Sequence, residues 1–234
     1  MQKMEKSKGL TANTLKIIAV LTMLIDHVGA SLVWQLVEQQ DTIYIIYRGM
    51  RYIGRIAFPI YCFFIVEGLL HTRSVKKYMA RLLVFALISE LPFDYALMGE
   101  FTMKYQNVFF TLALGLACIW GFQVLEEKMQ EGFGQILLKL AVLVVAYGAA
   151  ELMHTDYGGF GVAIIAVLYL LRKNKLMQCG AGAIGFSWEL TAPLSFVLLY
   201  YYNGEKGKQV NKYLFYGFYP VHLAVLAAVR LLCF

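Results

Sequence analysis

Residues 107–125 read NVFFTLALGLACIWGFQVL, a run of 19 residues that contains no Asp, Glu, Lys or Arg. An α-helix needs about 20 predominantly apolar residues to cross the hydrocarbon core of a bilayer, so this run is long enough to span a membrane. Seven further apolar segments flank it, and the eight predicted helices cover residues 13–36, 52–71, 78–98, 107–125, 133–153, 159–171, 176–202 and 213–233. The sixth is short for a span, which predicts that it is tilted or incompletely inserted.

The composition agrees with this pattern. Of the 234 residues, 60% are hydrophobic and 15% are charged, and the mean hydropathy is +0.61. A soluble domain is nearer half apolar and a quarter charged, and eight spans leave no room for one. We therefore predict an all-α fold, a polytopic transmembrane helical bundle of about eight spans that forms a single integral membrane domain over residues 1–234. No soluble basic face exists to carry the net charge of +6, so we expect a lipid bilayer as partner and no nucleic acid.

The distribution of Lys and Arg predicts the orientation of the helices. With the N-terminus on the inner side, 14 of these residues fall inside and 7 outside. Cytoplasmic loops carry an excess of Lys and Arg, so this count favours an N-in, C-in arrangement. The basic start of the chain, followed by the apolar residues 17–25, is similar to a signal peptide. Asp26 and His27 come directly after that run, so we expect the first helix to be retained.

Neither a disulfide framework nor a metal site is indicated. The four cysteines form no CxxC or CxxxC pair, and two of them, Cys62 and Cys118, lie inside apolar runs. The chain also lacks HxxxH and HExxH patterns, and two distant histidines are a weak metal signal. We expect no metal.

Polar and ionisable side chains interrupt several predicted spans, where a charge near the bilayer centre costs about 2.5 kcal/mol or more. In the predicted orientation nearly all of them lie between the midplane and the outer face, and only Glu67 lies nearer the inner end. This common depth predicts one water-accessible cavity that opens outward. The residues are Asp26, His27, Arg55, Glu67, Glu90, Asp94, Asn107, Asp156, Glu189 and His222.

Neighbouring positions on a helix point about 100° apart, so Asp26 and His27 are predicted to meet different neighbouring helices rather than each other. Arg55 is the expected partner of a carboxylate such as Asp26 or Asp94, because a guanidinium stays charged and binds carboxylates with two hydrogen bonds. The alternative interpretation of such a pair is a salt bridge that only holds helices together. Glu67 and Glu189 are interpreted as packing residues.

Two of the four histidines lie in the middle of predicted spans. A neutral imidazole at such a position accepts a proton near physiological pH, so His27 and His222 are candidate general bases. A lone buried histidine is more often structural than catalytic, but two at a similar depth favour chemistry. His71 is expected at an inner boundary and His154 in an outer loop.

The chain resembles the TraX family of bacterial multi-pass membrane proteins, named for the protein responsible for N-terminal acetylation of conjugative F pilin. The resemblance runs in order along nearly the whole chain. The matching segments are MLIDH at 23–27, GRIAFP at 54–59 with Glu67 and Gly68, YMARL at 78–82, ISELPF at 88–93, NVFFT at 107–111 with Gly115, DYG at 156–158 with Gly161, and FYPVHL at 218–223. The layout is also similar to that of membrane acetyltransferases such as heparan-glucosaminide N-acetyltransferase.

The resemblance implies an integral membrane acyltransferase of the bacterial plasma membrane that uses acetyl-CoA as acyl donor. The acceptor stays open between a protein amino terminus, an amino sugar and a cell-surface glycan hydroxyl. His27 or His222 would be the base, oriented by a carboxylate. The other candidates would bind substrate or stabilise oxyanion charge. The full set of candidates is His27, His222 and Asp26 for catalysis, and Arg55, Asp94, Asn107, Asp156 and Tyr219 for substrate binding.

Two other classes of function remain open. Intramembrane Asp, His and Arg with proline-broken helices also suit a transporter or flippase for a small polar solute or a lipid-linked intermediate, although no inverted repeat is visible. A membrane assembly factor without chemistry would leave the cost of the polar groups unexplained unless they all pair. The basic segments 73–81 and 172–175 suit the phosphates of coenzyme A, but ordinary positive-inside charge is the favoured explanation. Acetyl-CoA bound on the inner side would need to pass its pantetheine arm between the helices to reach a cavity that opens outward.

Overall fold

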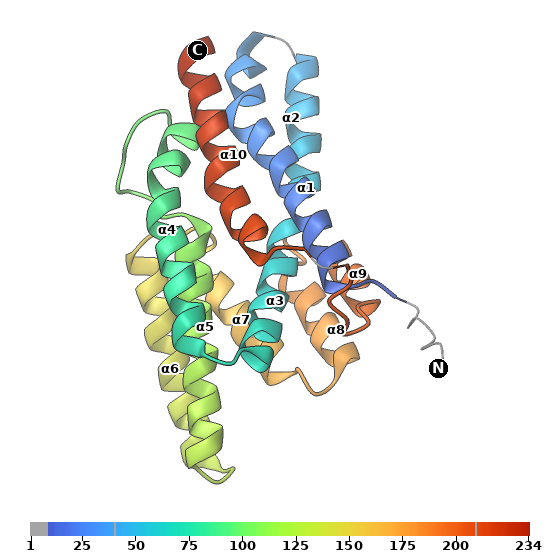
Figure 1. Cartoon of the computed structure of the whole chain (residues 1–234), viewed down its shortest axis with the longest axis vertical. Coiled ribbons are helices and arrows are strands. Elements are labelled where there is room, and N and C mark those ends of the chain that lie inside the picture. The colour runs from blue at the N-terminus through green and yellow to red at the C-terminus, as the bar shows by residue number, and fades with distance from the viewer. Residues whose placement is uncertain (1–8, 40, 209) are drawn as a thin grey trace.

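The computed structural model describes residues 9–39, 41–208 and 210–234, and the regular elements in these residues are all helices. The predicted all-α polytopic class is confirmed. The elements are α1 (Ala12–Ser31), η1 (Val33–Gln39), α2 (Asp41–Gly54), α3 (Ala57–His71), α4 (Val75–Leu97), α5 (Val108–Lys128), α6 (Phe133–Leu152), α7 (Gly158–Leu170), α8 (Lys175–Gly185), α9 (Leu194–Tyr200) and α10 (Lys212–Cys233). Figure 1 shows them as one elongated bundle.

Five helical segments in the described residues are long and apolar enough to cross a membrane. They are Ala12–Ser31, Asp41–His71, Val108–Lys128, Phe133–Leu152 and Tyr213–Cys233. The predicted sixth span corresponds to α7, which is apolar but only 13 residues long. The outward face of α6 exposes Ile136, Val144 and Val145 by 61% or more, as expected for side chains that contact lipid.

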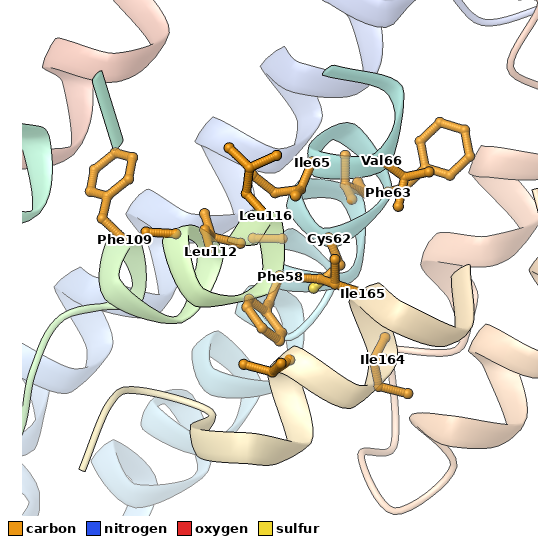
Figure 2. Close-up of a cluster of buried hydrophobic side chains, with 14 of the residues drawn as sticks. Phe58, Cys62, Phe63, Ile65, Val66, Phe109, Leu112, Leu116, Ile164 and Ile165 are labelled. Carbon is orange, nitrogen blue, oxygen red and sulfur yellow. The ribbon is translucent and has the colours of Figure 1, made fainter. Parts of the chain in front are cut away.

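The core forms where α3, α5 and α7 pack together. Figure 2 shows Phe58 and Cys62 of α3, Leu112 of α5 and Ile165 of α7 converging on this contact. The helices approach closely because Gly115 of α5 has no side chain. A Cβ at this position would collide with Ile165.

A short break divides residues 41–71 into two helices. Arg55 and Ile56 separate α2 from α3, and Pro59 lies in the first turn of α3, where its missing N–H costs nothing. The predicted second span therefore has a kink near its outer end, and this kink carries Arg55.

The predicted seventh span, residues 176–202, is not one helix. α8 ends at Gly185 and α9 begins at Leu194, and the two helices pack against each other as a hairpin. The base of the hairpin is closed by Lys175 Nζ, which donates to the carbonyl of Tyr202. The prediction failed because average hydropathy over 27 residues hides a polar, proline-containing stretch, residues 187–193, that stops the helix.

The hairpin also changes the orientation of the C-terminus. α1 and α10 run in the same direction, because Lys16 lies over the Phe215 ring at 5.7 Å and His27 contacts His222 further along. The end of α10 lies beside the end of α4, where Arg230 donates to the Ala96 carbonyl at 2.9 Å. α1 and α10 therefore run parallel (Figure 1), so if both cross a membrane, the start of α1 and the end of α10 lie on opposite sides, against the predicted N-in, C-in arrangement. Which side the N-terminus faces stays a prediction. With the N-terminus inside, the C-terminus would lie outside and Lys206 and Lys208 inside, in keeping with the positive-inside rule.

Cysteine labelling checks this orientation. Cys233 is the exposed cysteine among four whose other members are buried. In sealed right-side-out vesicles we expect a membrane-impermeant maleimide to modify Cys233. In a Cys233→Ser background, Lys173→Cys in the exposed α7–α8 loop should react only after permeabilisation. Labelling of both positions from the same side would contradict the hairpin topology.

Candidate functional site

A cavity of about 250 Å³ lies where α1, the α2–α3 break, the end of α4, the start of α7 and α10 meet. Its walls are largely apolar, with Met23, Phe58, Phe93 and Leu97 among them. Its polar lining comes from Asp26, His27, Arg51, Arg55, Asp156, Tyr157 and Tyr219. Five of the eight residues predicted from the sequence therefore line one chamber: Asp26, His27, Arg55, Asp156 and Tyr219.

His27 and His222 form a buried pair beside this cavity. His27 Nδ1 lies 2.7 Å from His222 Nε2, and the two rings are nearly parallel with their centroids 5.0 Å apart. Both side chains are buried, at 9% and 7% exposure. His27 lines the cavity directly, whereas His222 reaches it through His27. As predicted, Asp26 and His27 do not pair with each other.

The hydrogen bonds of this pair assign the tautomers of both rings. His222 Nδ1 lies 2.8 Å from the carbonyl oxygen of Phe218, which can only accept, so Nδ1 carries the proton. Neutral His222 then presents an unprotonated Nε2 that accepts from His27 Nδ1–H. His27 is left with an unprotonated Nε2, the nitrogen available to a ligand. The arrangement is that of a general base oriented by a second histidine.

Tyr219 supplies a hydroxyl next to the histidine pair. Its ring meets the His27 ring edge to face at 5.8 Å and the His222 ring at 5.6 Å. The hydroxyl is buried beside the backbone N–H of Val108, and its O–H has no acceptor in the described residues. A buried O–H without an acceptor is costly, so its position at a cavity points to a polar ligand.

Asp26 is held by Arg51 and by the close approach of α1 and α2. Arg51 Nη1 lies 2.8 Å from Asp26 Oδ2, while Asp26 Oδ1 is buried without a hydrogen-bond partner in the described residues. Gly54 makes this packing possible, because a Cβ there would collide with the Asp26 side chain. Asp26 thus lines the cavity, and its second carboxylate oxygen is packed against Gly54.

The predicted pairing of Arg55 with Asp26 or Asp94 is wrong. Arg55 Nε lies 3.3 Å from Glu189 Oε2, and Nη1 donates to the Tyr157 hydroxyl at 3.2 Å. Arg51, one turn earlier, takes the place at Asp26. The break between α2 and α3 turns Arg55 away from α1 and toward the α8–α9 hairpin and the start of α7.

The loop before α7 presents Asp156 and Tyr157 to the cavity. Tyr157 has a left-handed backbone with φ +64°, and its ring stacks on Phe58 with centroids 3.6 Å apart. The loop is fixed at Asp156, whose backbone N–H donates to Gln106 at 2.8 Å and whose carbonyl accepts from the Thr111 hydroxyl. Gly161 leaves room for this packing, because a Cβ there would collide with Thr111.

Asp156 lies outside the membrane-spanning helices and titrates near neutrality. Burial raises the pKa of its carboxyl to about 6. The nearby Arg55 cation lowers this pKa and the Asp26 carboxylate raises it, and each effect is smaller than that of burial. A carboxyl with a raised pKa contributes stability that is complete below its ordinary value near 3.8 and is lost as the pH rises through 6.

We therefore expect Asp156→Asn to stabilise the protein relative to wild type as the pH increases. The difference in melting temperature should be small at pH 3.5, below the ordinary pKa of the carboxyl, and largest at pH 7.5, where the charged carboxylate costs at most about 3 kcal/mol. Thermal unfolding in detergent at both pH values measures it. A difference that does not depend on pH would contradict the titration of Asp156.

Two predicted site residues hold the α4–α5 loop instead of lining the cavity. Asp94 Oδ2 accepts from the Thr102 backbone N–H at 3.0 Å. Asn107 caps α5 by accepting from Phe109 N–H at 3.1 Å, and its amide donates to the Ala86 carbonyl and to Glu90. The Asn107 amide and Asp94 Oδ2 are therefore used within the protein, whereas Asp94 Oδ1 is buried without a hydrogen-bond partner in the described residues.

Three residues of the site, Arg51, Tyr157 and Gly54, are not among the candidates predicted from the sequence. Arg51 is one of the seven Lys and Arg residues predicted on the outer side, Tyr157 belongs to the DYG segment and Gly54 to GRIAFP. The spacing of Arg51 and Arg55, four residues apart on one helix face, was the available signal for a second cation. In the described residues no group of three or more His, Cys, Asp or Glu side chains is placed to hold a metal ion.

The fold and the site define a class: a multi-pass helical membrane protein with a polar, histidine-containing cavity between its helices. A family model described as TraX protein matches residues 11–230. The chain belongs to the TraX family.

Curated relatives match at lower identity. The chain is similar to a protein of Dichelobacter nodosus named probable fimbrial assembly protein FimC, serogroup H1, at 27% identity over 97% of this chain and 99% of that protein. It is also similar to the uncharacterized protein RP591 of Rickettsia prowazekii (strain Madrid E), at 27% identity over 69% of this chain and 56% of that protein. No solved structure matches the chain.

Proposed function

We propose that the protein is a membrane acyltransferase that moves an acyl group from a thioester to an amine or hydroxyl, with His27 as general base. The observation that supports this most directly is the hydrogen-bond series from the Phe218 carbonyl through His222 to His27. It leaves a basic nitrogen facing a cavity whose lining also includes Asp26 and Tyr219, each with a polar atom that has no hydrogen-bond partner in the described residues.

His27 and His222 have different tasks in this proposal. His27 Nε2 removes the proton of the acceptor amine or hydroxyl as the acceptor bonds to the acyl carbon. The carbon–sulfur bond breaks, and His27 returns the proton to the leaving thiolate, so that atoms and charge balance. His222 is a positioning residue that holds His27 in the required tautomer.

Tyr219 and Asp26 would contact the reacting groups. The Tyr219 hydroxyl is a donor without a partner in the described residues and is suited to the developing oxyanion. Asp26 Oδ1 is suited to an N–H or O–H of the acceptor. The sequence predicted Asn107 and Asp94 as substrate-binding residues. Because neither lines the cavity, we assign these contacts to Tyr219 and Asp26.

Acetyl-CoA is the donor that family membership favours, and the cavity accommodates only part of it. Binding sites for whole cofactors occupy roughly 300–1,000 Å³, whereas this cavity measures about 250 Å³. The residues present fit the acyl thioester end together with the reacting group of the acceptor. The remainder of the donor would lie outside the cavity.

The relative named as a fimbrial assembly protein favours a pilus-related acceptor in the bacterial plasma membrane. A protein amino terminus, an amino sugar and a glycan hydroxyl remain the acceptor classes to compare. The lipid bilayer is the other partner that the exposed apolar helices require.

The experiment is acceptor-dependent thiol release from acetyl-CoA by protein purified into lipid nanodiscs. A peptide with a free amino terminus, glucosamine and an oligosaccharide serve as the three acceptor probes, and mass spectrometry of each probe detects the added acetyl group. Release that requires one of them supports the proposal. Absence of release and of acetylated product with all three would contradict it for these acceptor classes.

A transporter is the second candidate, and the broken helices favour it. The α2–α3 break and the non-helical tip of the α8–α9 hairpin meet beside the cavity through Arg55, which lines it, and Glu189, and broken helices also meet at transport sites. Uptake of labelled glucosamine into proteoliposomes without thiol release would support transport in place of acyl transfer.

A further inference from the structure

Glu189 occupies a position that packing alone does not explain. It lies at the tip of the α8–α9 hairpin, between Gly185 and Leu194, with its side chain 13% exposed. We propose that Glu189 is a positioning residue that holds Arg55 away from Asp26 and so leaves Asp26 free to bind the acceptor. This inference rests on the proposed function.

The hairpin tip is built against the α2–α3 break at two points. Glu189 Oε2 forms an ion pair with Arg55, with 3.3 Å between Oε2 and Nε, and the Thr191 hydroxyl donates to the carbonyl of Tyr52. A helix break leaves backbone groups without their usual partners, and Thr191 satisfies one of them. Glu189 and Thr191 thus bind the same break from neighbouring positions.

The tip itself is held in place. Phe186 is fully buried, with its ring edge to face against Phe58 and Phe160. Glu189 N–H donates to the Phe186 carbonyl at 2.9 Å, which closes a turn ahead of the carboxylate. The carboxylate is therefore presented from a packed segment.

Arg55 would have another partner if Glu189 were neutral. Arg55 and Asp26 line the same cavity, and Gly54, the residue before Arg55, packs directly on the Asp26 side chain. Asp26 Oδ1 has no hydrogen-bond partner in the described residues. A guanidinium released from Glu189 would bind that oxygen, because a charge-assisted hydrogen bond to a carboxylate is among the strongest available in a protein.

The kinetic test compares Glu189→Gln in two backgrounds. In the wild-type background we expect kcat/KM for the acetylated probe to fall about tenfold, mainly through the KM of the acceptor. In an Asp26→Asn background the same change should lower kcat/KM by less than twofold, because the competing carboxylate is gone. An equal factor in both backgrounds would show a merely structural role and overturn the inference.

Two variants serve as controls for charge and geometry. Glu127→Gln removes an exposed carboxylate at the far end of α5 and should leave kcat/KM unchanged. Glu189→Asp keeps the charge and should recover most of the activity. Loss of activity in Glu189→Asp equal to that in Glu189→Gln would contradict the role of the charge.

A second measurement keeps the inference separate from the reaction. The melting temperatures of Arg55→Gln, Glu189→Gln and the double variant form a cycle that reports the pairing without any substrate. We expect the melting temperature of the double variant to fall by less than the sum of the decreases in the two single variants. Additive losses would overturn the pairing, whereas coupled losses in a protein without thiol release would refute only the proposed function.

Discussion

Replacing His27 by glutamine is expected to lower kcat of acyl transfer about 10³-fold, the middle of the range that a positioned general base contributes. His222→Leu should cost about 10²-fold, because His27 then loses the acceptor that fixes its tautomer. His222→Gln should cost less than tenfold, because the glutamine oxygen can accept from His27 Nδ1–H in place of His222 Nε2. Single-turnover thiol release with saturating acceptor measures all three.

The relative sizes of the three decreases in kcat distinguish the general base from the positioning residue. A larger loss for His222→Gln than for His27→Gln would reverse the assignment of base and positioning residue. Equal rates in wild type and His27→Gln would remove His27 from the chemistry. Melting temperatures of the three variants show whether any loss arises from unfolding.

Gly54→Ala is expected to lower the free energy of unfolding by about 1–3 kcal/mol and kcat/KM more than tenfold. The new Cβ would overlap the Asp26 side chain, so α1 and α2 must separate or Asp26 must leave Arg51. Either adjustment displaces the carboxylate that faces the cavity. Thermal unfolding and thiol release measure the two effects.

Gly49→Ala is the matched control on the same helix. A Cβ at Gly49 meets no atom within 4 Å, so this change should stabilise α2 by about 0.5–1 kcal/mol and leave activity unchanged. If Gly54→Ala behaves like Gly49→Ala, the contact between Gly54 and Asp26 does not constrain the site.

Several residues of the site could be recognised from the sequence because they are polar or charged side chains within apolar runs. Asp26, His27 and His222 interrupt apolar runs, and a polar group inside a membrane requires a partner or a function. The prediction that Asp26 and His27 turn to different helices followed from helix geometry, and the structure places Arg51 and His222 opposite them.

The partners themselves could not be predicted. Arg55 was expected at Asp26, and it meets Glu189 from a segment 134 positions further along the chain. Nothing local to either residue encodes that contact, because it depends on the hairpin bringing residues 187–193 back into the bundle. The same hairpin reversed the expected side of the C-terminus, which an average of hydropathy over the seventh segment could not detect.

Hydropathy along the chain was sufficient to establish a helical membrane protein and the positions of most of its helices. These are properties of each segment and its solvent, since an apolar run must satisfy its backbone internally in lipid whatever its neighbours are. Which histidine carries the free nitrogen, which arginine binds Asp26 and how Glu189 reaches Arg55 were decided only by the tertiary structure. Each depends on hydrogen bonds between helices distant in sequence, and their geometry is set by how the whole bundle packs.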